Sequence, residues 1–532
     1  MPISYPPGTP WPPPAVVAAQ ERYTEWLTWY RGDPAELQAY YGRLAGVPTP
    51  RIRQSQFAGG ISGAVARAWW GRPQIGAGQA KVHVPAAADV AALSAGLLFS
   101  DPPTLALPES AASSQETLDD ILTKGGGYVA MHEAAEWGSA AGGVFVRASA
   151  NRDVADGPIL EAILPDCAAP EFYGPYLLAV TFWTKLSGRD ERPVIRHLER
   201  HEMINGVCWV THGLFAGAAD KLGRPIPLTE RPETERLAPL VDDTGSILIG
   251  TSKLDVVYVP TIKPNPYLPG TQLGRSDFAG AVQQLDNLDE VWTSLMRDFR
   301  LGKGRVFAPR QYIRTLGPEG SGGFFDPEQE IFQAVNAQLG SEGDKLALTA
   351  SQFAIRVDEH LRGANELWRM ILRRAGLDGN ENDSEAAPET ATSVNDKAAR
   401  KRGTRALKAG YWTPALRQIG LVLLELYRLH WDRNVVAAMP DIEWPDAAAP
   451  DIETMARTLQ LLDAAGAIST RTKVTMLHPE WSSDQIDEEV DAIAADKPPA
   501  PDFGDPGDLG ANVNPQDNTQ PVDSGGVNPD GG

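Results

Sequence analysis

The chain has 532 residues, of which 42% are apolar and 22% charged, a composition that is ordinary for a soluble globular protein of about two to four domains. Its formal net charge of −21 argues against tight, sequence-independent binding of nucleic acid, because that affinity comes from cations that replace the counterions of the phosphates. No apolar run approaches the roughly 20 residues that a membrane span needs.

The N-terminus and the two cysteines give a first indication of the compartment. The opening "MPISYPPGTPWPPP" lacks the basic and apolar regions of a secretion signal. Cys167 and Cys208 form no disulfide framework, and without a cluster of histidines they form no zinc site. We therefore expect both to be small buried apolar residues of a protein in a reducing cytoplasm.

The first half of the chain predicts short helices followed by a β-rich body, and hence an α+β fold. Residues 15–44 have the spacing of two amphipathic helices divided at Gly32-Asp33-Pro34, and "PAAADVAALSAGLLF" predicts another helix. From Val144 to about Pro260 the apolar period changes to two, in short runs such as "YLLAVTFWTKL" and "GVCWVTHGLFA" between turn residues. This pattern indicates antiparallel strands.

Two long amphipathic helices are predicted after this body. Within 276–301 apolar residues recur every three or four positions, and Ser276 can cap the helix start. The segment 351–376 repeats the pattern, with Ser351 as its cap and Gly376 as its stop. The stretch between the two helices is compact and rich in loops.

The last third begins with a polar, acidic loop at 377–396. A third helical stretch then starts at Lys397 and runs to about Val436, bent near Gly410 and Pro414. Two further helices, in "DIETMARTLQLLDAAGAIS" and "SSDQIDEEVDAIAAD", are joined by "TRTKVTMLHPEW". The acidic, Pro- and Gly-rich residues after 497 are expected to be disordered.

The motifs that usually carry chemistry fail on inspection. In "MHEAAEWGS" the second zinc-binding histidine of H-E-x-x-H is replaced by Glu136. His197 and His201 have a metal spacing only on a helix, whereas their surroundings alternate as in a strand. No Walker motif or nucleophile elbow occurs, and the C-terminal helix pair is too acidic for a DNA-reading helix-turn-helix. We therefore predict no catalytic residue, metal or cofactor.

Four segments in the same order carry a likeness to a known family. They are "KVHVPAAADVAALSAGLLFSDPP" (81–103), "GRSDFAGAVQQLDNLDEVWTSLMRDFRLGKGRVFAP" (274–309), "ETATSVNDKAARKRGTRALKAGYWTPAL" (389–416) and "LHPEW" (477–481). The chain resembles the portal proteins of tailed double-stranded DNA bacteriophages, in particular a siphophage group that includes actinobacterial phages.

The resemblance implies a non-enzymatic homo-oligomeric ring, usually a dodecamer, at one capsid vertex of a virion assembled in the host cytoplasm. Double-stranded DNA would pass through the ring transiently during packaging and ejection. The implied protein partners are the major capsid and scaffolding proteins, the terminase large subunit and the head–tail adaptor, with no membrane involved.

The same resemblance implies a division of the chain into named parts. They are the wing (1–275), a stem helix (276–301), the clip (302–350), the second stem helix (351–376), the tunnel loop (377–396), the long wing helix (397–449), the crown (450–497) and an acidic tail (498–532).

A dense basic segment stands out in the acidic chain. On a helix, four of its cations would share one face: Lys397, Lys401, Arg405 and Lys408. We hypothesise that this face pairs with acidic groups of the tunnel loop in the same or a neighbouring subunit. A solvated surface and direct contact with the DNA backbone are the alternatives. The acidic tunnel-loop candidates are Asp378, Glu381, Asp383, Glu385 and Glu389.

The stem helices have candidate packing residues of their own. Periodic apolar residues are core residues by default, but in a ring part of that core lies between subunits. The candidates for stem or inter-subunit packing are Trp292, Phe299, Leu367 and Met370. Two other readings stay open, namely another structural head or adaptor protein, and a hydrolase that uses carboxylates near His197 or His201.

Overall fold

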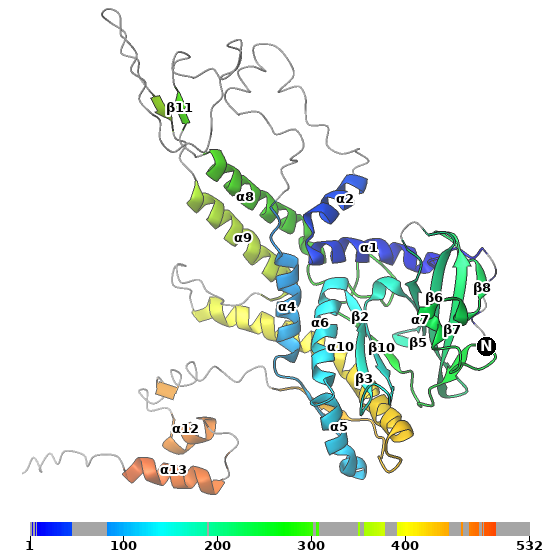
Figure 1. Cartoon of the computed structure of the whole chain (residues 1–532). Coiled ribbons are helices and arrows are strands. Elements are labelled where there is room, and N and C mark those ends of the chain that lie inside the picture. The colour runs from blue at the N-terminus through cyan, green and yellow to red at the C-terminus, as the bar shows by residue number, and fades with distance from the viewer. Residues whose placement is uncertain are drawn as a thin grey trace, which may run out of the picture. The chain divides into compact units, whose positions relative to one another are not determined.

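The computed structural model describes residues 3, 6, 8–44, 82–188, 191–301, 305–307, 349–351, 356–377, 391–445, 459–460, 468–477, 481 and 483–495. The chain divides into two compact units, Met1–Ala447 and Ala448–Gly532. Helices and antiparallel strands both occur in the first unit (Figure 1), so the predicted α+β class is confirmed.

The predicted N-terminal helices are present as α1 (Pro14–Arg31) and α2 (Pro34–Leu44). Gly32 ends α1 in the left-handed conformation, at φ 66°, which is the usual role of glycine at this position. The third predicted helix is α4 (Ala86–Phe99), whereas α5 (Gln115–Leu122) and α6 (Gly127–Ala141) were not predicted. Trp26 and Trp29 of α1 are buried in a core that also contains α4.

The β-rich body consists of two antiparallel sheets. The smaller has the order β10-β2-β3. The larger has the order β4-β5-β6-β7-β8, and β9 also pairs with β7. The strands are β2 (Gly143–Ser149), β3 (Ile159–Ile163), β4 (Ala168–Tyr173), β5 (Tyr176–Lys185), β6 (Val194–Ile204), β7 (Val207–Gly217), β8 (Arg224–Ile226), β9 (Ser246–Leu248) and β10 (Val256–Pro260). The antiparallel prediction is confirmed, although β4 and β8 were not predicted.

Short elements connect these parts. They are β1 (Thr104–Ala106), which pairs with β13 (Asp441–Glu443), and the helical turns η2 (Glu109–Ser114), η3 (Pro165–Cys167), η4 (Leu228–Glu230) and α7 (Pro232–Glu235). Cys208 is buried as expected, but Cys167, at the end of η3, is exposed, so that part of the cysteine prediction is wrong.

The two long helices are present, with later starts than predicted. A turn, η5 (Ala279–Ala281), precedes α8 (Val282–Leu301), and Ser276 donates its hydroxyl to the carbonyl of Ser139 instead of capping the helix. The second helix is α9 (Val357–Ala375). Ser351 is not its cap, because it belongs to strand β12 (Thr349–Ser351), which pairs with β11 (Arg305–Phe307).

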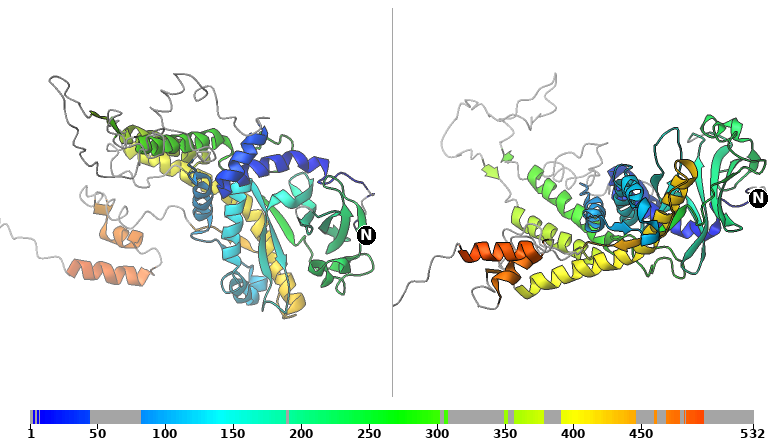
Figure 2. Two further views of the ribbon diagram at one scale, coloured as in Figure 1. Left: turned by 45° about the horizontal axis from the view of Figure 1, so that its top comes forward. Right: turned by 90° about the horizontal axis from the view of Figure 1, so that it is seen from below.

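The third long helix, α10 (Ala391–His430), starts earlier and ends earlier than predicted. Residues 391–396, expected in the acidic loop, are its first turns. Pro414 lies inside the helix, and α10 changes direction along its length (Figures 1 and 2), as predicted from a proline that removes a backbone hydrogen bond. Its second half is buried in the largest apolar core through Ile419, Val422 and Leu423.

The second unit is described in part. Helices α12 (Thr470–Leu477) and α13 (Ser483–Ala495) contact each other, and Val474 and Ile486 are buried. The helix α13 was predicted, but α12 lies in the segment predicted as a linker. The acidic tail at 498–532 is outside the described residues, as is most of the first predicted helix of this unit. No described helix combines the length and the apolar character that crossing a membrane requires.

Two glycines of α9 give opposite predictions. Gly376 ends the helix at φ 70°, and a Cβ there would lie 2.3 Å from Thr404 Oγ1, so Gly376→Ala is expected to lower the free energy of unfolding by more than about 1 kcal/mol. Gly363 lies inside the helix with open space around the Cβ position, so Gly363→Ala is expected to raise it by about 0.5–1 kcal/mol. Urea unfolding of both variants measures the change in the free energy of unfolding. Equal changes would contradict the different backbone conformations assigned to the two glycines.

Candidate functional site

Helices α8 and α9 form an antiparallel pair. At one end of the pair, His360 Nε2 of α9 lies 3.2 Å from Asp298 Oδ2 of α8. At the other end, the C-terminal part of α9 contacts η5, just before α8. The helices lie side by side in every view (Figures 1 and 2), and the β11–β12 strands follow directly from the first end. We call the end near η5 the base of the pair and the other end the tip.

Burial decreases from the base of the pair to its tip. Near the base, Leu285 of α8 and Ile371 of α9 are buried in one apolar core with α1 and α4. Near the tip, Phe299 of α8 is 41% exposed and Leu361 of α9 is 38% exposed. The chain therefore covers the base with its own body and leaves large apolar side chains at the tip in contact with solvent.

The four residues predicted for stem packing all lie on this pair. Trp292 and Leu367 are half-buried and pack against the core at the base, and Met370 is also half-buried. Phe299 is exposed. The pattern therefore placed these residues on apolar faces, and packing between subunits stays a prediction for them.

The segment directly before α4 forms hydrogen bonds to the middle of α8. Asp289 of α8 accepts a hydrogen bond from the backbone N–H of Val84 at 2.9 Å, and its other oxygen lies 2.9 Å from His83 Nδ1. Thr293, one turn further along α8, accepts from the backbone N–H of Val82. Asp289 is thus a buried carboxylate whose partners come from a segment about 200 residues earlier in the chain.

A buried ion pair connects the base of the helix pair to α10. Lys408 Nζ lies 2.5 Å from Asp277 Oδ2, and the two side chains are 3% and 0% exposed. The same oxygen accepts a 2.5 Å hydrogen bond from Ser139 Oγ of α6, and Lys408 also donates to Ser94 Oγ of α4. Because buried charges are costly unless they are paired and hydrogen-bonded, this contact fixes four elements against one another.

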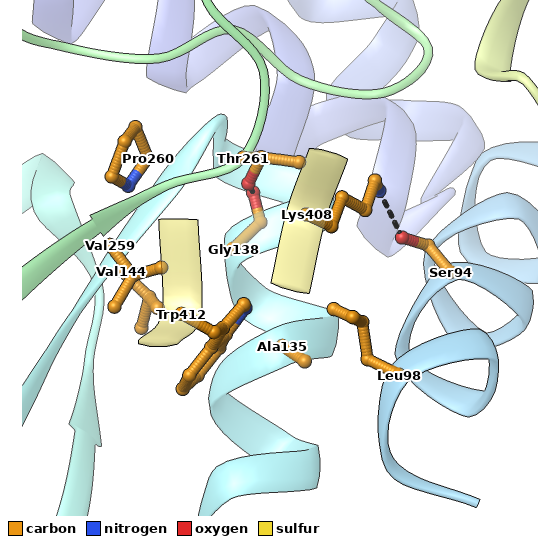
Figure 3. A pocket seen from close by; sticks show the side chains of 10 residues that line it. All are labelled: Ser94, Leu98, Ala135, Gly138, Val144, Val259, Pro260, Thr261, Lys408 and Trp412. Atoms are coloured by element: carbon orange, nitrogen blue, oxygen red, sulfur yellow. Dashed lines mark hydrogen bonds between the residues drawn. The ribbon is translucent and has the colours of Figure 1, made fainter. Parts of the chain in front are cut away.

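A small pocket adjoins this pair (Figure 3). It is lined by Lys408 and Trp412 of α10 and by residues of α4, α6 and the two strands of the small sheet that face α10. It leaves room for about one water molecule. The pocket is therefore too small to receive an organic substrate.

The cations of the predicted basic face do not form one exposed surface in the structure. Lys401 is exposed, but Arg405 donates to the carbonyls of Leu97 and Pro445, and Lys408 is buried. The role predicted for Lys408 beside the acidic loop is wrong, because its partner is Asp277 in the body of the chain. For Arg405 the guanidinium is likewise occupied by backbone carbonyls.

The remaining members of these sets lie outside the described part. No side-chain position is described for Lys397. The acidic candidates Asp378, Glu381, Asp383, Glu385 and Glu389 lie in 378–390, which the structure does not describe. Their pairing with Lys397 or Lys401 stays a prediction.

The rejected histidine motifs have other partners. Glu136 accepts a hydrogen bond from the hydroxyl of Tyr30 at 2.6 Å. His197 and His201 lie on strand β6, as the alternation of the sequence predicted. Within the described ranges, no group of three or more His, Cys, Asp or Glu side chains is arranged to hold a metal ion.

Sequence reasoning missed the carboxylates that organise this site. The sequence pattern did not single out Asp277 and Asp289, because their partners are brought close only by the fold. The available signal was the single lysine among apolar residues in "ALKAGYW", where helical spacing places Lys408 on the same face as the buried Trp412.

Comparisons with known proteins give distant structural neighbours only. No protein-family model matches the sequence, and no curated protein matches it. Among solved structures, the neck of a native GTA particle computed with C12 symmetry is 12% identical, covers 83% of this chain and 98% of its own, and has a TM-score of 0.35. The neck of an empty GTA particle computed with C6 symmetry is 13% identical, covers 82% and 97%, and has a TM-score of 0.33. Scores this low carry no argument about fold or function.

The Lys408–Asp277 pair gives a test of the site's base. Lys408→Met leaves a buried carboxylate unpaired and is expected to lower the free energy of unfolding by about 3–5 kcal/mol. Lys408→Met combined with Asp277→Asn is expected to cost less than the single Lys408 variant, because no unpaired charge remains. Urea unfolding measures both.

The matched control is Lys401→Met, two turns earlier on α10 at an exposed position. It is expected to change the free energy of unfolding by less than about 0.5 kcal/mol. An equally small effect of Lys408→Met would show that the buried pair does not hold α10 in place.

Proposed function

We propose that this chain is a portal-type subunit of a tailed-phage virion, which assembles with copies of itself into a ring around a channel for double-stranded DNA. In this proposal the α8–α9 pair is the stem, the segment between the two helices is the clip, and α10 is the long wing helix. The terminase motor and later the head–tail adaptor would dock at the clip end. The protein's role is structural, without catalysis.

One observation carries the proposal, namely the unequal burial of the α8–α9 pair. A two-helix pair that projects from a body cannot bury apolar side chains on all sides by itself. At the tip, Phe299 and Leu361 remain exposed although they continue the apolar faces that are buried at the base. A neighbouring copy that packs against this surface would remove them from water, at roughly 25 cal/mol per Å² of apolar area. Repetition of such a head-to-tail contact closes a ring.

The charge of the chain fits a channel through which DNA must slide. Each cation held against a phosphate releases counterions and gains affinity, and a wall of such contacts would slow the duplex. The net charge of −21 per subunit, repeated around a ring, avoids strong adhesion. Lys401, exposed on the first half of α10, is the described cation that we assign to pairing with an acidic group of a neighbouring copy.

The order of the sequence segments supports portal over other virion proteins. The likeness runs through α4 and the residues on either side of it, the α8 helix, the start of α10 and the C-terminal unit, in that order. An adaptor or minor head protein remains the alternative structural role. Electron microscopy distinguishes them, because a portal requires a central opening wide enough for a duplex.

The assembly interface is tested by polar substitutions at the tip of the helix pair. Phe299→Gln and Leu361→Gln are expected to lower the fraction of rings at least about tenfold, because the contact between copies loses its central apolar groups. The thermal midpoint of the monomer should change little, since both side chains are already exposed. Mass photometry and negative-stain images of the full-length protein measure the ring fraction.

The matched control is Leu429→Gln near the end of α10, where the leucine is 47% exposed. It should leave ring formation unchanged. Two results would overturn the proposal: a protein that stays monomeric under every assembly condition, and rings that form equally well with and without the tip substitutions.

A further inference from the structure

A cluster of ionised side chains lies between the two β-sheets. Asp255, directly before β10 of the small sheet, faces His201 on β6 of the large sheet. His201 is 1% exposed, and both Asp255 oxygens lie within 3.0 Å of its Nδ1. Its other nitrogen, Nε2, lies 3.0 Å from Glu199 Oε1. Since an ionised carboxylate can only accept, both ring nitrogens must donate, and His201 is an imidazolium ion.

Arg147 extends the cluster across the sheets. This residue of β2 donates to Glu199 of β6 at 2.5 Å and to Glu161 of β3 at 2.6 Å. Cys208 of β7 is fully buried and donates its thiol to Asp255 at 3.3 Å. Two carboxylates opposing burial raise the pKa of His201 to about 9, and the same contacts hold the pKa of Glu199 far below its usual range despite burial.

A second pair of histidines borders this cluster. His197 of β6 and His212 of β7 are stacked, with ring planes 14° apart and His197 Nε2 lying 3.2 Å from His212 Nδ1. One N–H between the two nitrogens makes this contact favourable, whereas protonation of both rings puts two donors face to face. Burial lowers the pKa of His212 to about 4 and also lowers that of His197, with Glu199 acting in the opposite direction and Arg147 and His201 adding repulsion at His212.

We propose that these groups form an acid-sensitive joint between the two sheets. Near neutral pH the two cations His201 and Arg147 bridge three carboxylates, those of Asp255, Glu199 and Glu161, and these contacts hold the sheets together. On acidification the stacked His197–His212 pair takes up a proton beside two existing cations. The resulting repulsion loosens the contact between β6–β7 and the small sheet while the helical core stays folded.

The direction of the effect follows from proton linkage. His212 and His197 have folded pKa values below the 6.5 of an unfolded chain, so the open form binds more protons, and the joint weakens as the pH falls from about 6.5 towards about 4. His201 has a raised pKa, so its contribution is complete below about 6.5 and is lost as the pH rises through about 9. The contact between the sheets is therefore strongest near pH 6.5 and weakens both towards about pH 4 and towards about pH 9.

Cys208 reports directly on the opening of this joint. In a Cys167→Ser variant of the full-length protein it is the only thiol, and burial keeps its pKa high and its reactivity low. The test is the rate at which 4,4′-dithiodipyridine labels Cys208, divided by the rate at which it labels glutathione at the same pH. This ratio removes the intrinsic pH dependence of a thiol. The relative rate is expected to rise at least about tenfold between about pH 7 and about pH 4.5.

Four variants separate the joint from other effects of acid. His197→Gln with His212→Gln should abolish the rise, and His212→Gln alone should reduce it, while His430→Gln, an exposed histidine on α10, should leave it unchanged. A Val422→Cys reporter in a chain lacking both native thiols lies in the helical core and should stay unreactive over the same range. The proposal is overturned by a relative rate independent of pH, by an unchanged rise in the His197→Gln/His212→Gln variant, or by parallel exposure of the Val422→Cys reporter.

Discussion

The contact between Lys408 and Asp277 is the constraint on which the arrangement of the long helices depends. It joins α10, which carries the lysine, to the start of the α8–α9 pair, and Ser94 and Ser139 add α4 and α6 to the same point. Each partner satisfies a charge that would otherwise be buried alone. A shift of α10 by one residue would carry the ammonium group away from this carboxylate, so the contact specifies the register of the helix.

Apolar packing alone would specify that register less sharply. The second half of α10 is covered on most sides by aliphatic residues, which tolerate small displacements at modest cost. Further polar contacts remove this tolerance. Glu425 accepts hydrogen bonds from the backbone and hydroxyl of Ser252, and Gln418 donates to the carbonyl of Leu254. Ser252 and Leu254 belong to the short loop that leads into Asp255. Helix α10 therefore also positions the loop that supplies the carboxylate facing His201.

The parts of this fold that the sequence predicted well are those governed by local periodicity. The strands around His197 and His201 and the stops at Gly32 and Gly376 follow from alternation and from the conformational freedom of glycine. The failures share another cause. By local rules Ser276 and Ser351 are ordinary helix caps and Lys408 is an ordinary surface residue. In the fold, Ser276 bonds to a distant carbonyl, Ser351 belongs to a short strand, and Lys408 pairs with a buried carboxylate. Such partners lie more than a hundred residues away for Ser276 and Lys408, and no local pattern encodes them.

The α8–α9 pair differs in the same way between its two ends: at the base the side chains have partners within the chain, whereas at the tip large apolar side chains are exposed. At the base the buried charges of Lys408 and Asp277 are partners of each other within the chain, and the apolar faces are buried. At the tip Phe299 and Leu361 keep the helical periodicity of a buried face without being buried. A soluble chain gains nothing from such a face in isolation, since exposed apolar area favours association. In the proposed ring, this exposed face would be one side of a contact between copies, and the buried base would fix the angle at which each copy presents it.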